Sequence, residues 1–265
     1  MLKKLIKYDL KDAFNKVILI YATLALTLAG AYRLFSLFSE IFLWEIVSKI
    51  CLGASISMAV SLIINVVIHA WVNFSISVYS DRGYLTHTLP IRKSTIYTSK
   101  VLSSMICLLI SVLIAGVAMF VLLYSDKTVE LYKQLSIIVN ETYEVGMATL
   151  LITIATEIFF QTFALIQAGW IGIILGRRMQ NGKRGYSFLF GAVTYIVFQW
   201  IAVVGILIAS LFKEGMLKTI FTASDAIEVG VLKSLLIGAI VIYAVIDALA
   251  YVLAVKFFNK GVNLE

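Results

Sequence analysis

Long apolar runs alternate with short polar segments along the chain. Six runs reach the roughly 20 mostly apolar residues that a bilayer-spanning helix needs, and each contains at most one charged residue. These runs cover about residues 17–38, 50–78, 99–124, 147–176, 186–212 and 234–255. The pattern predicts an all-α integral membrane protein, with six transmembrane helices in one domain over residues 17–257 and a short cytoplasmic tail over residues 258–265.

The first sixteen residues follow a different pattern. Leu2, Ile6, Leu10 and Phe14 repeat at helical spacing, while lysines and aspartates occupy most of the other positions. A helix with one apolar face and a lysine-rich polar face lies in the plane of the membrane interface. Residues 1–16 are therefore predicted to form an interfacial amphipathic helix that leads into the first span.

The composition agrees with membrane insertion. Hydrophobic residues make up 61% of the chain and charged residues 14%, and the mean hydropathy of +0.98 lies outside the soluble globular range. The only two cysteines, Cys51 and Cys107, both fall within predicted spans and show no metal-ligand or disulfide spacing. Both fit the role of small apolar residues in helix packing.

The distribution of positive charge predicts the orientation. With the N-terminus placed in the cytoplasm, fifteen lysines and arginines fall on the cytoplasmic side and six on the opposite side. Such a bias sets the topology of membrane proteins through the positive-inside rule. Both ends of the chain are therefore expected in the cytoplasm. The net charge of +7 follows this bias and does not point to nucleic acid.

The second predicted span contains a polar residue at every fourth position. Six positions share this spacing: Ser57, Ser61, Asn65, His69, Asn73 and Ser77. Steps of four residues advance about 400° around a helix, so these side chains form one slowly winding ridge. Polar groups facing hydrocarbon are costly, and the ridge is expected to face protein or water. It either packs against other helices, including a dimer partner, or lines a substrate path.

Two acidic residues lie inside predicted spans. Glu157 is in the fourth span, and Asp247 in the sixth lies four residues from both Tyr243 and Tyr251. An intramembrane carboxylate is a functional candidate by default. It can instead be neutral or satisfied by the tyrosine hydroxyls, and Arg33 can pair with Glu157 or reach the interface. The candidates for a substrate path or for helix packing are Ser61, Asn65, His69, Asn73, Glu157, Gln161 and Asp247.

No motif for catalysis or nucleotide binding is present. The stretch from Gly176 to Arg184 resembles a phosphate-binding loop only loosely, because five residues separate Gly176 from Gly182 and no serine or threonine follows Lys183. The chain also lacks the G-x-S-x-G and H-E-x-x-H patterns. We therefore expect no enzyme activity, bound cofactor or metal site in the chain itself.

The segment between the second and third spans differs from the other connections. It contains Pro90, the only proline of the chain, followed by Arg92 and Lys93. Proline fixes φ and disfavours helix at the preceding Leu89, so it separates a short surface segment from the next span. The basic side chains can meet lipid phosphates or acidic groups of a partner.

This segment carries a family resemblance. The sequence "YSDRGYLTHTLPIRKSTIYTSKVL" resembles the first cytoplasmic turn of the ABC-2 type permeases of bacterial ABC transporters, where a "tLPisr…sK" pattern forms or adjoins the coupling helix. The opening "LIKYDLKDAF" is also similar to small Gram-positive and clostridial permeases of this kind. The resemblance implies a coupling element formed by Arg82, Tyr84, Leu85, Thr86, His87, Thr88, Leu89, Pro90, Arg92 and Lys93.

The resemblance also implies partners and a substrate class. Two permease chains, as a homodimer, would pair in the bacterial cytoplasmic membrane with two separate ATPase subunits that hold ATP and Mg²⁺. The cargo would be amphipathic or antimicrobial peptides, such as phenol-soluble modulins, or similar lipophilic substrates. The alternatives from the residues alone are an ion-coupled secondary transporter or channel that uses Glu157 and Asp247, a membrane enzyme, or a membrane protein without transport activity.

Overall fold

The computed structural model describes residues 2–38, 40–80, 83, 88, 91–124, 126–143, 146–179, 181–211 and 229–260. Helices account for 93% of these residues, and no strand occurs among them. This confirms the predicted all-α class.

The helices follow the apolar runs closely. Their bounds are α1 Leu2–Ala13, the π-helical turn η1 Phe14–Ile18, α2 Leu19–Ser36, α3 Phe42–Tyr79, α5 Lys93–Leu123, α6 Asp126–Tyr143, α7 Met147–Gly176, α8 Lys183–Leu211 and α10 Val229–Asn259. Within the described ranges, six helices are long and apolar enough to cross a membrane, with α1, η1 and α2 counted as one continuous helix. The six predicted spans are therefore confirmed by length and composition.

The chain divides into two compact units, each of which contains three of these helices. Unit 1 comprises Met1–Val129 and unit 2 comprises Glu130–Asn263, with α6 crossing the boundary. The sequence prediction treats the six spans as one domain, and the two units divide that domain into halves.

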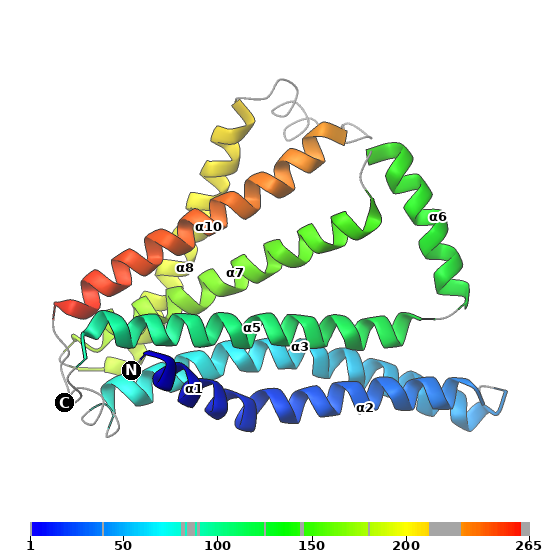
Figure 1. The fold of residues 1–265 in the computed structure, drawn as a ribbon, viewed down its shortest axis with the longest axis horizontal. Helices are drawn as coiled ribbons and strands as arrows, with labels where there is room; N and C mark the ends of the chain where they lie inside the picture. The colour runs from blue at the N-terminus through cyan, green and yellow to red at the C-terminus, as the bar shows by residue number, and fades with distance from the viewer. Residues whose placement is uncertain are drawn as a thin grey trace. The chain divides into compact units, whose positions relative to one another are not determined.

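Small residues bring the helices of unit 1 together. Ala25 of α2, Ala59 of α3 and Ala118 of α5 are at most 3% exposed and form one cluster where the three helices run side by side (Figure 1). The Ser55 hydroxyl of α3 donates a hydrogen bond to the Ala25 carbonyl of α2 at 2.9 Å. Close approach of small residues with an added hydrogen bond is a common way to join helices in lipid.

Unit 2 is built on a close contact between α7 and α8. A Cβ atom placed on Gly172 of α7 would lie 2.3 Å from the backbone nitrogen of Gly191 in α8, and one on Gly176 would lie 2.3 Å from that of Ser187. Only glycine permits this separation. The connection between the two helices includes Gly182 at φ +67°, a conformation that glycine adopts without strain.

The structure differs from the sequence prediction at several helix boundaries. α3 begins at Phe42, eight residues before the predicted start, and its added turns contain Glu45 and Lys49, which form an exposed i,i+4 ion pair at 2.6 Å. α6 lies in a segment that the apolar pattern assigns to a connection. A helix also occupies Leu2–Ala13, while the interfacial placement of residues 1–16 stays a prediction.

Candidate functional site

The proline-containing segment connects α3 to α5 in unit 1. Of the predicted coupling residues, the structure describes Thr88, Arg92 and Lys93. Arg92 is exposed and extended, with φ −63° and ψ 138°, and its carbonyl accepts a hydrogen bond from the Thr95 amide at 2.9 Å as α5 begins at Lys93. The remaining residues lie outside the described ranges: Arg82, Tyr84, Leu85, Thr86, His87, Leu89 and Pro90.

Both helix ends that flank this segment are fixed by buried aromatic rings. Phe74, near the end of α3, packs edge-to-face against Tyr97 of α5, with ring centroids 6.1 Å apart and an interplanar angle of 89°. Phe74 also packs against Tyr79 at 6.3 Å. Phe74 and Tyr97 are fully buried, so we call Phe74, Tyr79 and Tyr97 the aromatic clamp. Edge-to-face pairs of this kind add to the stability that burial alone gives.

The N-terminal helix is attached to the same end of unit 1 by a buried ion pair. The Lys100 Nζ atom of α5 lies 2.6 Å from the Asp9 Oδ1 atom of α1, and the two side chains are 9% and 14% exposed. The buried charges are thereby neutralised across two helices that are far apart in sequence. Lys100 falls within the third predicted span, residues 99–124, and the structure places it in contact with α1.

A second polar contact joins α1 to α3. His69 Nε2 lies 3.2 Å from Asp12 Oδ2, and Lys16 Nζ lies 2.6 Å from Asp12 Oδ1. His69 is only 14% exposed, while Lys16 is 56% exposed. Asp9 and Asp12 therefore connect one face of α1 to two spans.

The predicted ridge on α3 is half-buried at the four candidate positions Ser61, Asn65, His69 and Asn73. Asn65 donates its side-chain amide to the Ser61 carbonyl of its own helix at 2.8 Å. His69 reaches α1 through Asp12. These contacts favour the packing interpretation at His69 and leave a substrate path a hypothesis for the ridge as a whole.

The buried acid of unit 2 pairs with a glutamine that the sequence analysis did not single out. Gln167 Nε2 of α7 donates to the Asp247 carbonyl at 3.1 Å and to Asp247 Oδ1 of α10 at 3.0 Å. Asp247 is 7% exposed and Gln167 is 1% exposed. Tyrosine hydroxyls were one of the alternatives for satisfying Asp247. In the structure its Oδ1 atom accepts from the Gln167 amide, and its Oδ2 atom has no partner among the described residues.

Tyr243 makes its contact with a different helix. Its hydroxyl donates to the Gln199 Oε1 atom of α8 at 2.9 Å. Gln161 and Glu157 of α7 lie near the same hydroxyl, which places two more of the predicted candidates beside α10. Unit 2 thus contains polar contacts between α10 and both of its neighbours.

Arg33 has partners within unit 1. Its Nε atom donates to the Val121 carbonyl of α5 at 2.8 Å, and its guanidinium carbon lies 6.0 Å from the centroid of the Tyr124 ring. The sequence left two alternatives for Arg33: an ion pair with Glu157, or a side chain that reaches the membrane interface. The contacts with α5 and Tyr124 favour the second alternative.

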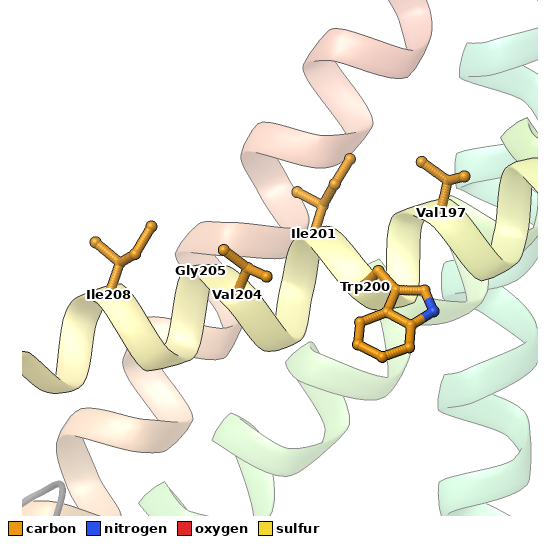
Figure 2. Close-up of a pocket in the computed structure, with 6 residues that line it drawn as sticks. All are labelled: Val197, Trp200, Ile201, Val204, Gly205 and Ile208. Carbon is orange, nitrogen blue, oxygen red and sulfur yellow. The ribbon is translucent and has the colours of Figure 1, made fainter.

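A shallow groove on α8 has only apolar lining. Figure 2 shows its six residues along that helix, with α10 crossing near Gly205. Ile242 of α10 would lie 3.1 Å from a Cβ placed on Gly205. The lining offers no charged or hydrogen-bonding side chain apart from the Trp200 indole, and so matches acyl chains better than a polar ligand.

The comparisons with known proteins identify no relative. No protein-family model, curated protein or solved structure matches the chain. Among the described residues, no group of three or more histidine, cysteine, aspartate or glutamate side chains is placed to hold a metal ion. Any functional assignment therefore depends on the residues and contacts described above.

The residues that the sequence analysis missed are those whose partners lie on other helices. Gln167 and Gln199 are isolated amides in apolar spans, and Asp9 belongs to the polar face of α1. A signal was present in each case, because an amide or carboxylate in a membrane helix needs a partner. The identity of that partner required the helix packing.

Proposed function

We propose that the chain is the transmembrane permease subunit of a bacterial ABC exporter. Its cargo would be amphipathic or antimicrobial peptides, or similar lipophilic substrates, and a separate ATPase would drive it. The observation that carries the proposal is the connection between α3 and α5, in which the "TLPIRK" sequence joins two membrane-length helices whose adjoining ends are clamped together.

The clamp gives a route for mechanical coupling. A force applied to residues 82–93 reaches α3 through Phe74 and Tyr79 and α5 through Tyr97. Because these rings are buried and tightly packed, the two helix ends move together rather than separately. The buried Lys100–Asp9 pair would carry α1 with them.

The proposed assembly contains two copies of this chain, as a homodimer, and two ATPase subunits. ATP and Mg²⁺ would be bound by the ATPase, since this chain lacks a phosphate-binding loop. Its N- and C-termini would face the cytoplasm of the bacterial cell, as the positive-inside rule predicts. Closure of the ATPase dimer would then rock the spans and open a path for the peptide.

The test is the substitution Leu89→Asp. We expect the variant to insert into the membrane but to lose substrate-stimulated ATP hydrolysis and transport, because a buried charge would disrupt an apolar contact with the ATPase. The readouts are ATPase activity and peptide transport in vesicles that contain both subunits. Leu135→Asp, a matched change at an exposed leucine of α6, serves as the control and should leave both activities intact. Normal stimulation in Leu89→Asp contradicts the proposal.

An ion-coupled secondary transporter is the second candidate. It is favoured by the buried carboxyl of Asp247 within a membrane-length helix, with Glu157 on the neighbouring α7. Transport by this mechanism would continue without an ATPase, would resist vanadate and would require an ion gradient. Transport that stops with vanadate excludes it.

A further inference from the structure

Asp247 and Gln167 leave two oxygen atoms without a hydrogen-bond partner. Gln167 Nε2 donates to Asp247 Oδ1 at 3.0 Å, but neither Asp247 Oδ2 nor Gln167 Oε1 has a partner among the described residues. Both side chains are more than nine-tenths buried. Asp247 lies twelve residues before the end of α10, or about 18 Å along a helix that rises 1.5 Å per residue.

The two unpartnered atoms are both acceptors if the carboxyl is ionised. An ionised aspartate has no proton to donate, and an amide oxygen only accepts. Two buried acceptors without a donor are unfavourable, and a buried carboxylate without a cation is more so. Within the part of the chain that the structure describes, Gln167 is the only hydrogen-bonding or charged partner of Asp247.

A single added proton removes this conflict. Protonation of Oδ2 turns one of the two acceptors into a donor and removes the buried charge. Rotation of the Gln167 amide by 180° does not remove the conflict. The amide oxygen would then face the backbone carbonyl of Asp247, and both of these oxygens only accept.

We propose that Asp247 is a proton-binding site within the membrane, held neutral as a carboxylic acid paired with the Gln167 amide. The pair connects α10 to α7 in unit 2 without a net charge in the apolar region. This inference does not depend on an ATPase partner, because it concerns only the protonation of one buried pair.

A sodium ion is the main competing occupant. Its ligands would be the same two oxygens, but a hard cation of this kind requires more oxygen ligands than two. The described surroundings of Asp247 supply no other carboxylate. The geometry therefore favours a proton, and sodium becomes an outcome of the test.

The test is infrared spectroscopy of the full chain in lipid nanodiscs at neutral pH. Aspartate labelled with ¹³C in the carboxyl group separates the aspartate signals from those of Glu157 and the other glutamates. We expect the carbonyl stretch of a protonated acid in the wild-type spectrum and its loss in Asp247→Asn. The control Asp12→Asn, which changes a partly exposed aspartate of α1, should retain the band.

A second measurement uses thermal stability. Asparagine mimics the neutral acid because it accepts from Gln167 with its oxygen and donates with its nitrogen, so Asp247→Asn should melt within about 2 °C of the wild type. Gln167→Leu removes the partner and should lower the melting temperature by about 4 °C or more.

The outcomes divide clearly. An acid band that disappears in Asp247→Asn, with near-native stability of that variant, supports the proposal. A wild-type spectrum without the band overturns it, as does a band that persists in Asp247→Asn or a variant that fails to fold. A band seen in potassium but abolished by sodium assigns the site to a metal cation instead of a proton.

Discussion

At the residue scale, burial distinguishes two ion pairs that have the same length. Lys100–Asp9 and Lys16–Asp12 each have an N–O distance of 2.6 Å. The first pair is 9% and 14% exposed and joins two helices, while the second is 56% and 29% exposed within one helix. A buried charge that loses its partner is costly, whereas an exposed one returns to water.

The substitution Lys100→Met should therefore destabilise the protein by about 3 kcal/mol, because it leaves the Asp9 carboxylate buried without a partner. The measurement is chemical unfolding in detergent micelles. Lys16→Met is the matched control and should cost less than about 1 kcal/mol. Addition of Asp9→Asn to Lys100→Met should recover part of the loss, and equal losses for the two single lysine variants would contradict the assignment.

The residue scale also shows what the sequence predicts and what it leaves open. Asp247 and Glu157 stand out because charge is rare in apolar spans. The pairing of Asp247 with Gln167 cannot be predicted from the sequence pattern. The two residues are 80 positions apart and meet only when α7 packs on α10. Local spacing offers Tyr243 and Tyr251, each one turn away, but Asp247 Oδ1 pairs with Gln167 when the helices pack.

At the element scale, the close approach of α7 and α8 depends on glycine. In Gly172→Ala the new Cβ would lie 2.3 Å from one backbone atom and 2.4 Å from another of Gly191. A helix backbone cannot yield as a flexible side chain can, so the two helices must separate. We expect a loss of about 3 kcal/mol in unfolding free energy.

The control for this substitution is Gly238→Ala in α10, where a Cβ meets no atom within 4 Å. That change should stay within about 1 kcal/mol of the wild type, since alanine favours a helix over glycine. The same unfolding assay serves both variants. If Gly172→Ala is as stable as Gly238→Ala, α7 and α8 do not approach as the structure shows.

The sequence predicts the presence of the membrane-length helices more reliably than the residues at which they begin and end. An apolar run long enough to cross a bilayer identifies a span without any tertiary information. The apolar pattern does not predict α6, because the segment is polar overall. Its Tyr132, Leu135 and Val139 nevertheless repeat at helical steps of three and four residues. The early turns of α3 contain the charged residues Glu45 and Lys49, which a hydropathy pattern does not count as part of a span.

At the scale of the whole molecule, one contact in each unit joins a terminal helix to a helix end beside a basic connection. In unit 1 the contacts of Asp9 with Lys100 bring α1 to the end where the proline-containing connection begins. In unit 2 the Arg178 guanidinium, just after α7, donates to the Phe257 carbonyl near the end of α10. The cytoplasmic location of both termini stays a prediction from the positive-inside rule.

The central claim is that this chain conducts a substrate but draws its energy from another subunit. The direct measurement is transport of a labelled amphipathic peptide by vesicles that contain the purified chain, with and without the proposed ATPase subunit. The account predicts ATP-dependent transport that vanadate abolishes, only when both subunits are present. Nucleotide hydrolysis or ATP-driven transport by the chain alone would contradict it.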